Sequence, residues 1–594
     1  MLNIICFLVA FLLFLSTVTL TVTESVLKGK RSSRMKPVHI FIIGFLVTGA
    51  FLFFPVYFTE FDGIPNLFGR VFNAVIVSLY NVLKLFILDG EASNLVAYAK
   101  TLDSVLGTPY SIFGLILFII APFLTLGYIL SFFKNIASYF KYLVAFTKDA
   151  YVFSELNDNS ASLAKDVSKK HPDALLVFAG LSFEDDKCAS AMEKLQGLNT
   201  VFFKNELSLV NLSFHSKKRK LTFFLICNDE EKNVELFTSI KTRYKDRENT
   251  ELYLFSSSVQ SEMLLSAQSD GKIVTRRINP AQSLVYRDLY DNGFELFENA
   301  IPDENGKKII SAVIVGMGNY GTILTKTLAW FCQMDGYSVK INAFDQSVNA
   351  KSVFSSSCPE LLDEKYNGKT IVGEPEYDIT IHSGYDYKSS EFDDVIRSIT
   401  DATYVFVSIG SDERNIDCAT KIRMLFERIG IHPVIKAVVY NGDLKTALET
   451  ATNFKGQAYD VKLVGDTETT YCEDVIIDPE LETDALNRHK KYGSEDDFWK
   501  YEYNSKSSMA SAIHMRARIK CGIKGADKAE SELTEEEATG IEVLEHKRWN
   551  AYMRSEGYVF APKRNDLAKT HHNLVCFDDL SLEDKLKDRR VGSK

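Results

Sequence analysis

The sequence lacks paired cysteines, metal-ligand spacings and a surplus of basic residues. Its nine cysteines stand singly, with no CxxC pair, which predicts neither a disulfide framework nor a zinc site and suits a reducing compartment. Histidines such as His382, His432 and His489 also lack the spacing of metal ligands. The formal net charge of −10 argues against a protein that binds nucleic acid duplexes, because phosphate backbones need a surplus of Lys and Arg.

Patterns typical of catalysis and of potassium selectivity are also missing. Residues 301–480 contain neither a Tyr-x-x-x-Lys pair nor a nucleophile elbow, so we expect no catalytic residues and no enzyme. A membrane-tethered NAD-dependent enzyme is the least favoured alternative. The chain has no TVGYG filter; Thr125-Leu126-Gly127-Tyr128 lies inside an apolar run with no pore helix before it. A selective potassium channel is therefore disfavoured.

Long apolar runs are confined to the first quarter of the 594 residues. Residues 2–22, 38–58 and 111–133 have the length and composition of membrane spans, and we expect a kink at Pro122 in the third. The first run lacks the cationic start and the small-residue cleavage site of a signal peptide, so we predict a retained anchor. Residues 1–149 thus form a predicted transmembrane region in contact with the lipid bilayer.

Basic residues set the expected orientation of these spans. One cluster lies between the first two spans and another follows the third. By the positive-inside rule both clusters are cytoplasmic, which predicts a multi-pass inner (plasma) membrane protein with an outside N-terminus and a cytoplasmic soluble part. The residues concerned are Lys28, Lys30, Arg31, Arg34 and Lys36, then Lys134, Lys141 and Lys148.

Residues 71–88 are apolar but interrupted. Asn73, Tyr80, Asn81 and Lys84 fall within a sector of about 100° on a helix. This amphipathic helix either lies flat or packs at the interface, or it faces water in an oligomeric pore. A fourth true span would place the basic loop outside the cell.

In residues 150–300, short apolar runs alternate with helical patterns, which predicts a parallel, doubly wound sheet. The predicted strands are 174–179, 200–203, 221–227 and 251–255, with a helix at 231–244. The first of these strands runs into Ala-Gly-Leu-Ser-Phe-Glu and not into a glycine-rich turn. We therefore expect a degenerate nucleotide-binding fold, with a structural or dimerising role favoured over ligand binding.

Residues 301–485 carry a dinucleotide-binding fingerprint. Strand 311–315 is followed by Gly316-Met317-Gly318-Asn319-Tyr320-Gly321, a helix at 322–333 and a strand at 338–344 that ends at Asp345. In this context Gly316 permits a tight turn, Gly318 lets a pyrophosphate approach the helix start, and Gly321 allows close packing of the helix. Asp345 is placed to bind ribose hydroxyls. The alternative is a fold that keeps its glycines for packing alone.

A second part of this predicted site follows strand 403–409. Ser408 and Gly410 lie at its carboxyl end, where open parallel sheets bind ligands. A helix at 413–428 and a strand at 433–440 complete the pattern. These stretches resemble the regulatory nucleotide-binding domains of potassium channels and transporters, the RCK or TrkA-N family, in tandem. The resemblance implies an adenine nucleotide or dinucleotide as regulator and a ring of domains. The chain differs from this family in lacking a potassium filter.

Residues 486–594 predict a small, mainly helical unit. Thr534 and Glu537 form a possible capping box at the start of a helix. The stretch Glu545-His546-Lys547-Arg548-Trp549, then Gly557-Tyr558 and the residues after His572, resembles the ryanodine-receptor repeat domain. Arg548, Trp549, Tyr558 and His572 offer stacking and charged hydrogen bonds that suit a nucleobase and a phosphate. A purely structural or assembly role is the alternative.

The predicted fold class is therefore N-terminal transmembrane helices plus α/β: two Rossmann-like, doubly wound parallel-sheet domains and a small, mainly α C-terminal domain. We expect a nucleotide-sensing membrane effector, a ligand-gated ion channel or pore that works as a homo-oligomer. Its ligand would be NAD-like, ADP-ribose-like or a cyclic nucleotide, acting as a regulator and not as a redox cofactor. A role in antiviral defence fits this architecture but rests on analogy alone. The alternative is a regulatory subunit of a cation (K⁺) transport system.

Overall fold

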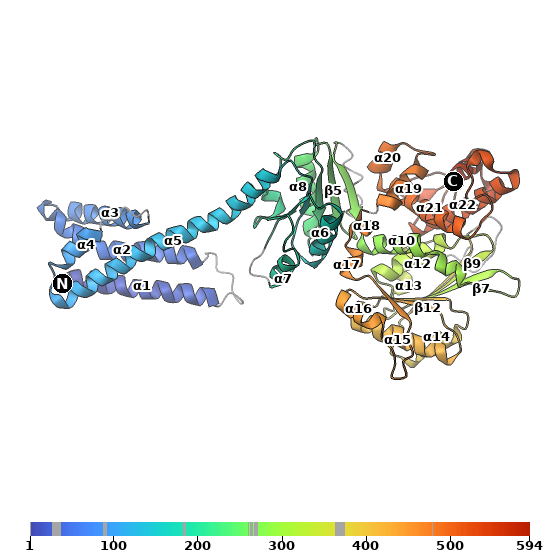
Figure 1. Cartoon of the computed structure of the whole chain (residues 1–594), viewed down its shortest axis with the longest axis horizontal. Coiled ribbons are helices and arrows are strands. Elements are labelled where there is room, and N and C mark those ends of the chain that lie inside the picture. The colour runs from blue at the N-terminus through green and yellow to red at the C-terminus, as the bar shows by residue number, and fades with distance from the viewer. Residues whose placement is uncertain are drawn as a thin grey trace. The chain divides into compact units, whose positions relative to one another are not determined.

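The computed structural model describes most of the chain, and contacts divide it into two compact units, Met1–Lys141 and Tyr142–Lys594 (Figure 1). The basic loop at residues 28–36, on which the predicted orientation depends, lies outside the described residues. The described residues are 2–26, 37–86, 92–181, 186–258, 261, 265, 271–362, 375–477 and 479–594.

Four helices of the first unit are long and apolar enough to cross a membrane. Three of them contain the predicted spans, and the helix that contains the third span runs on through Pro109 and Pro122. The helices are α1 Leu2–Val26, α2 Pro37–Glu60, α3 Leu67–Leu85, the short α4 Ala92–Ala99, and α5 Ser104–Ala145.

Helix α3, the segment predicted as amphipathic, runs antiparallel to α2. Near its start, the Arg70 guanidinium lies 3.9 Å from the Phe58 ring centroid, and its Nε donates to the Phe58 carbonyl oxygen at 2.8 Å. Beyond its end, the Phe86 ring meets the edge of Phe45 at 5.3 Å between centroids. Contacts at both ends therefore place α3 alongside α2 over most of its length.

The polar stripe predicted on α3 is only partly exposed. Asn81 is buried, and its Nδ2 donates to the Val77 carbonyl within the helix. Asn73 and Tyr80 are exposed, and Lys84 is half-exposed. Asn81 therefore lies at the edge of the stripe that borders the buried face of the helix.

The first sheet has the strand order β3-β2-β1-β4-β5-β6, and every neighbouring pair is parallel. The four predicted strands are present, but the first strand of the sheet is Ala150–Phe153, which the sequence analysis missed. Its four apolar residues come four residues after the end of a long apolar helix and carry no period of their own. The strands are β1 Ala150–Phe153, β2 Leu175–Phe178, β3 Thr200–Phe202, β4 Leu221–Leu225, β5 Thr250–Phe255 and β6 Val274–Ile278; the helices are α6 Asp158–Lys170, α7 Asp186–Lys194, α8 Glu230–Tyr244, α10 Pro280–Asn292 and α11 Phe294–Glu298.

The second sheet repeats this order as β10-β9-β8-β11-β12-β13, with all of these pairs parallel and β7 antiparallel to β8 at one end. The predicted strands and helices are present, whereas β10 and β13 were missed. The strands are β7 Ile301–Pro302, β8 Lys308–Val315, β9 Tyr337–Asp345, β10 Tyr377–Ser383, β11 Tyr404–Val407, β12 Val434–Val438 and β13 Val461–Val464; the helices are α12 Asn319–Phe331, α13 Ala350–Ser357, α14 Ser390–Ser398, α15 Asp412–Arg428 and α16 Gly442–Glu449.

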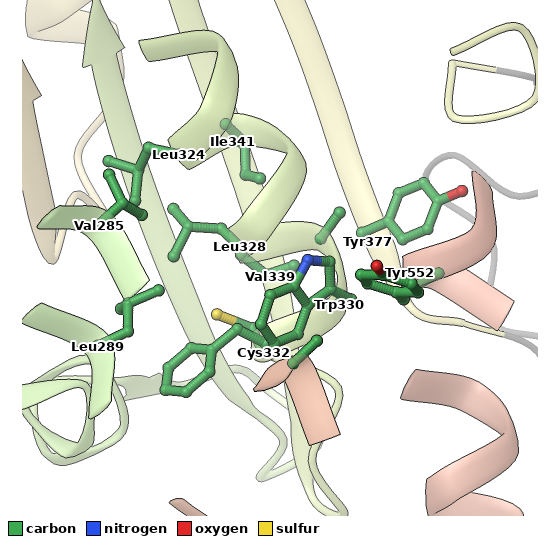
Figure 2. Close-up of a cluster of buried hydrophobic side chains, with 14 of the residues drawn as sticks. Val285, Leu289, Leu324, Leu328, Trp330, Cys332, Val339, Ile341, Tyr377 and Tyr552 are labelled. Atoms are coloured by element: carbon green, nitrogen blue, oxygen red, sulfur yellow. The ribbon is translucent and has the colours of Figure 1, made fainter. Parts of the chain in front are cut away.

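The C-terminal part is mainly helical and shares a core with the second sheet. Trp330 of α12 meets Tyr552 of α22 edge-on at 6.1 Å between centroids, so the core crosses the predicted boundary at residue 485 (Figure 2). The predicted capping box of Thr534 and Glu537 is present at the start of α22. The elements are α17 Thr467–Thr470, α18 Glu473–Ile476, α19 Pro479–His489, α20 Glu495–Lys500, α21 Glu502–Lys520, α22 Glu535–Ser555, β14 Val559–Phe560, β15 Thr570–His571 and α23 Leu582–Gly592.

Candidate functional site

A cleft of about 280 Å³ opens at the carboxyl ends of β8, β9 and β11. It lies where the strand order changes direction, because β8 is flanked by the strand that follows it on one side and by β11 on the other. We call it the glycine-loop cleft. The predicted residues Gly316, Gly318, Asn319, Tyr320, Asp345, Ser408 and Gly410 all line it, together with Tyr385, Tyr387, Arg414 and Tyr440, which the sequence analysis missed.

The three glycines of the motif have different surroundings. Gly316 has a φ of +95°, and a Cβ there would lie 2.3 Å from the Ser408 carbonyl oxygen. A Cβ on Gly321 would lie 1.9 Å from the Gly316 carbonyl oxygen. Gly318 differs, because no described atom lies within 4 Å of its Cβ position. The first and third glycines thus serve packing, whereas the second keeps the cleft open.

The N-terminus of α12 faces this cleft without a side-chain cap, since its N-cap residue is Gly318. The matching helix of the first sheet, α6, is closed by a capping box in which the Asn157 side chain accepts from Ser160 N at 2.9 Å. The first N–H groups of a helix carry partial positive charge and bind anions. Of these two helices, only α12 therefore leaves its N-terminus open to a ligand.

Asp345 holds the glycine loop as well as lining the cleft. Its Oδ2 accepts from Met317 N at 2.7 Å, and its Oδ1 accepts from Ser347 N at 2.8 Å. Each carboxylate oxygen has a second lone pair, so both can still accept from hydroxyl groups of a ligand. The hydrogen bond to Met317 N was not predicted from the sequence, and the contact with ribose hydroxyls stays a prediction.

The described lining of the cleft also carries one cation and several phenols. Arg414 Nη2 donates to Gln346 Oε1 at 3.3 Å, and its guanidinium lies 6.0 Å from the Tyr387 ring centroid. The Tyr320 and Tyr440 rings lie 6.5 Å apart. Burial raises the pKa of both of these phenols, so they stay protonated and can donate hydrogen bonds at neutral pH.

In the first sheet the corresponding position is filled by the protein itself. Strand β1 is followed by Ser154–Asn157, which contains no glycine. Ser154 Oγ accepts from Ile226 N at 2.8 Å, and Asn157 Nδ2 donates to the Ile226 carbonyl oxygen at 2.9 Å. These contacts close the gap between β1 and β4 and leave no glycine-lined turn for a phosphate.

A second cleft, of about 290 Å³, lies within the C-terminal helices. Of the four residues predicted there, Arg548 and Trp549 line it, whereas Tyr558 and His572 do not. Tyr558 is buried and its hydroxyl donates to Asp566 Oδ1 at 3.3 Å. His572 is exposed, and the buried His571 lines the cleft in its place. The two imidazole rings stack at 4.9 Å between centroids, so the predicted His572 lies beside a residue of the cleft without lining the cleft itself.

Among the residues that the structure describes, no group of three or more His, Cys, Asp and Glu side chains could hold a metal ion. No protein-family model matches the chain, and no curated protein matches it significantly. Function must therefore be argued from the two clefts and the apolar helices.

Proposed function

We propose that the chain is a nucleotide-regulated membrane protein, in which an adenine nucleotide or dinucleotide bound in the glycine-loop cleft opens a homo-oligomeric ion channel or pore. The observation that carries the proposal is the uncapped N-terminus of α12 at the point where the strand order changes direction. The order β10-β9-β8-β11-β12-β13 is that of the Rossmann fold, in which a dinucleotide pyrophosphate binds at this position.

Each part of the cleft suits one part of such a ligand. The N–H groups of the uncapped first turn of α12 suit the phosphates, and the oxygens of Asp345 suit ribose hydroxyls. Tyr385, Tyr387 and Arg414 offer aromatic and cationic contacts to a base or to a second phosphate. No acid–base pair or nucleophile is needed for this role, so we propose a regulator and not an enzyme.

Ligand binding can reach the membrane unit through a continuous helix. Helix α5 runs from a candidate span to Ala145, and β1 begins at Ala150. Near the end of α5, the buried Tyr142 hydroxyl is 2.9 Å from His215 Nδ1 of the first sheet region. We propose that a rearrangement of that sheet acts on the membrane unit through α5, which joins the two units in sequence. A shift from 1:99 to 99:1 needs about 5.5 kcal/mol of differential ligand affinity, which several subunits can share.

The packing of α3 supports a fourth span over a flat interfacial helix. Its 19 residues extend about 28 Å, close to the thickness of the hydrocarbon layer. A helix that follows the candidate span α2 from Phe58 to Phe45 crosses the same layer. The exposed Asn73 and Tyr80 would then need polar surroundings within the membrane. A water-filled path between subunits supplies them.

The fourth span disagrees with the charge rule. With a cytoplasmic soluble part, four spans place the N-terminus inside and the basic loop outside, against the positive-inside rule. We give the packing more weight, because the contacts extend over most of α3 and a flat helix could not make them. Labelling of the basic loop from outside intact cells tests this choice.

Purified full-length protein in dye-loaded and ion-loaded liposomes tests the function. We expect flux when NAD, ADP-ribose or a cyclic adenine nucleotide is added, and no flux from a Gly318→Val variant. Gly540→Val is the matched control, because Gly540 is exposed and its Cβ position is also free of neighbours. Nucleotide binding without flux would instead favour a regulatory subunit of a cation transport system. Absence of nucleotide binding would refute both.

A further inference from the structure

The C-terminal cleft is built around buried charge. It lies among α19, α20, α21, α22 and α23, and its described lining has no residue in common with the glycine-loop cleft. At its floor, Glu545 is buried and pairs with two guanidinium groups: Arg548 Nη2 lies 2.8 Å from Oε1, and Arg518 Nη2 lies 2.5 Å from Oε2. A cluster of this kind is rare in a purely structural core, because charge is costly to bury.

Three buried guanidinium groups meet in this cluster. Arg488, Arg518 and Arg548 are all buried beside the carboxylate of Glu545, and the half-buried Asp588 lines the same cleft. Backbone carbonyls at the end of α23 accept hydrogen bonds from two of them, since Arg488 donates to Val591 and Arg518 donates to Gly592. Burial lowers the pKa of Arg488 to about 10; Glu545 opposes this shift, and the neighbouring guanidinium groups add to it.

One buried polar atom of the cleft lining has unused hydrogen-bonding capacity. Arg548 Nη1 has no hydrogen-bond partner in the described ranges of the chain, although Arg548 is only 1% exposed. Buried polar atoms are almost always hydrogen-bonded, and an unpaired N–H on a charged group is especially costly. Its position in the lining indicates that a bound molecule supplies the partner.

The rest of the lining indicates the chemistry of that molecule. Tyr492, Tyr503, Trp549 and His571 offer ring faces and edges, which suit a planar ring. Arg564 and Lys587 add cations, and carboxylates such as Asp497 can accept hydrogen bonds from hydroxyl or amino groups. An anionic group next to Arg548 and a planar, hydroxyl-bearing body fit this combination.

We propose that the C-terminal cleft is a second ligand site, which binds a nucleoside monophosphate with its phosphate on Arg548 and its base against Trp549. The site is independent of the glycine-loop cleft. It gives the protein a second input, so that two nucleotides can act on one membrane unit.

Calorimetric titration of the full-length Gly318→Val protein in detergent with AMP tests the site, because this background lacks the first nucleotide site. We expect one AMP per chain. Adenosine, ribose 5-phosphate and inorganic phosphate should each bind at least tenfold more weakly, since each lacks a part of the ligand. Thermal unfolding with the same four compounds provides a second readout where the heat of binding is small.

Three substitutions in this background localise the site. Trp549→Ala and Arg548→Lys should each weaken AMP binding at least tenfold, because one removes the stacking surface and the other removes the unpaired guanidinium N–H. Phe560→Ala is the control, since Phe560 is an exposed aromatic residue outside the cleft. The proposal is overturned if AMP neither binds nor raises the unfolding temperature. It is equally overturned if folded Trp549→Ala protein binds AMP as tightly as the parent does.

Discussion

Replacement of Gly318 by valine separates ligand binding from folding more cleanly than any other change in the glycine motif. Gly318 has φ −70° and ψ −157°, a conformation that any residue adopts. No described atom lies within 4 Å of its Cβ position. The valine side chain should therefore enter the cleft without disturbing the fold, at the point where a phosphate must approach α12.

The expected loss of affinity follows from the hydrogen bonds that the side chain blocks. A hydrogen bond to a charged group contributes about 1.5–3 kcal/mol. Two blocked phosphate contacts at the N-terminus of α12 therefore cost about 3 kcal/mol, which corresponds to roughly 150-fold in Kd. Thermal stability without ligand should fall by no more than about 1 kcal/mol, because valine is a poorer N-cap residue than glycine but meets no described neighbour at its Cβ position.

Titration calorimetry and thermal unfolding measure the two quantities on the same protein. Gly316→Ala is the contrasting variant. Its φ of +95° and the 2.3 Å approach to the Ser408 carbonyl should lower stability by more than about 1 kcal/mol even without ligand. Unchanged nucleotide affinity in folded Gly318→Val protein would show that the glycine loop is not the binding site. Unfolding of that variant would refute the description of the open Cβ position.

Three further predictions concern other parts of the chain. Asn157→Ala should lower stability by about 1–2 kcal/mol without changing nucleotide affinity, because it removes the cap of α6 far from the ligand; equal unfolding temperatures would contradict this. Tyr80→Cys should react with a membrane-impermeant thiol reagent faster when nucleotide is present, whereas Val75→Cys on the exposed apolar side should not; equal rates would count against a water path along α3. Burial alone would raise the pKa of Glu545, but Arg548 and Arg518 lower it to about 2. The folded state thus binds fewer protons than the unfolded state, and this stabilisation, present above pH 4.5, is lost as the pH falls towards 2. Glu545→Gln should flatten the acid side of the stability curve and cost about 3–5 kcal/mol at pH 7; an unchanged curve would refute the assignment.

Local patterns in the sequence were enough for the glycine-loop cleft. The motif Gly316–Gly321 follows a β-branched strand, and Asp345 ends the next one. Both features lie on consecutive elements, so their spacing along the chain determines their spacing in the sheet. The same reasoning found the Thr534 capping box, which involves residues only three apart. Apolar runs long enough to span a membrane were equally visible.

Other features depend on contacts between residues far apart in the chain, and only the tertiary structure decided them. Strand β1 was missed because four apolar residues after a long apolar helix carry no period. Arg414 and Tyr440 come from separate elements that meet only when the sheet forms. The C-terminal cluster joins Arg488, Arg518 and Glu545 from three helices.

The sequence by itself therefore determined which segments are apolar, where the parallel strands end in glycine, and which helix begins with an uncapped turn. These properties depend on residues within one or two elements of each other. The tertiary structure decided which side of each element is covered, such as His571 inward and His572 outward, and which buried charges share one carboxylate. Burial and charge balance are sums over many distant neighbours, and no local pattern contains them.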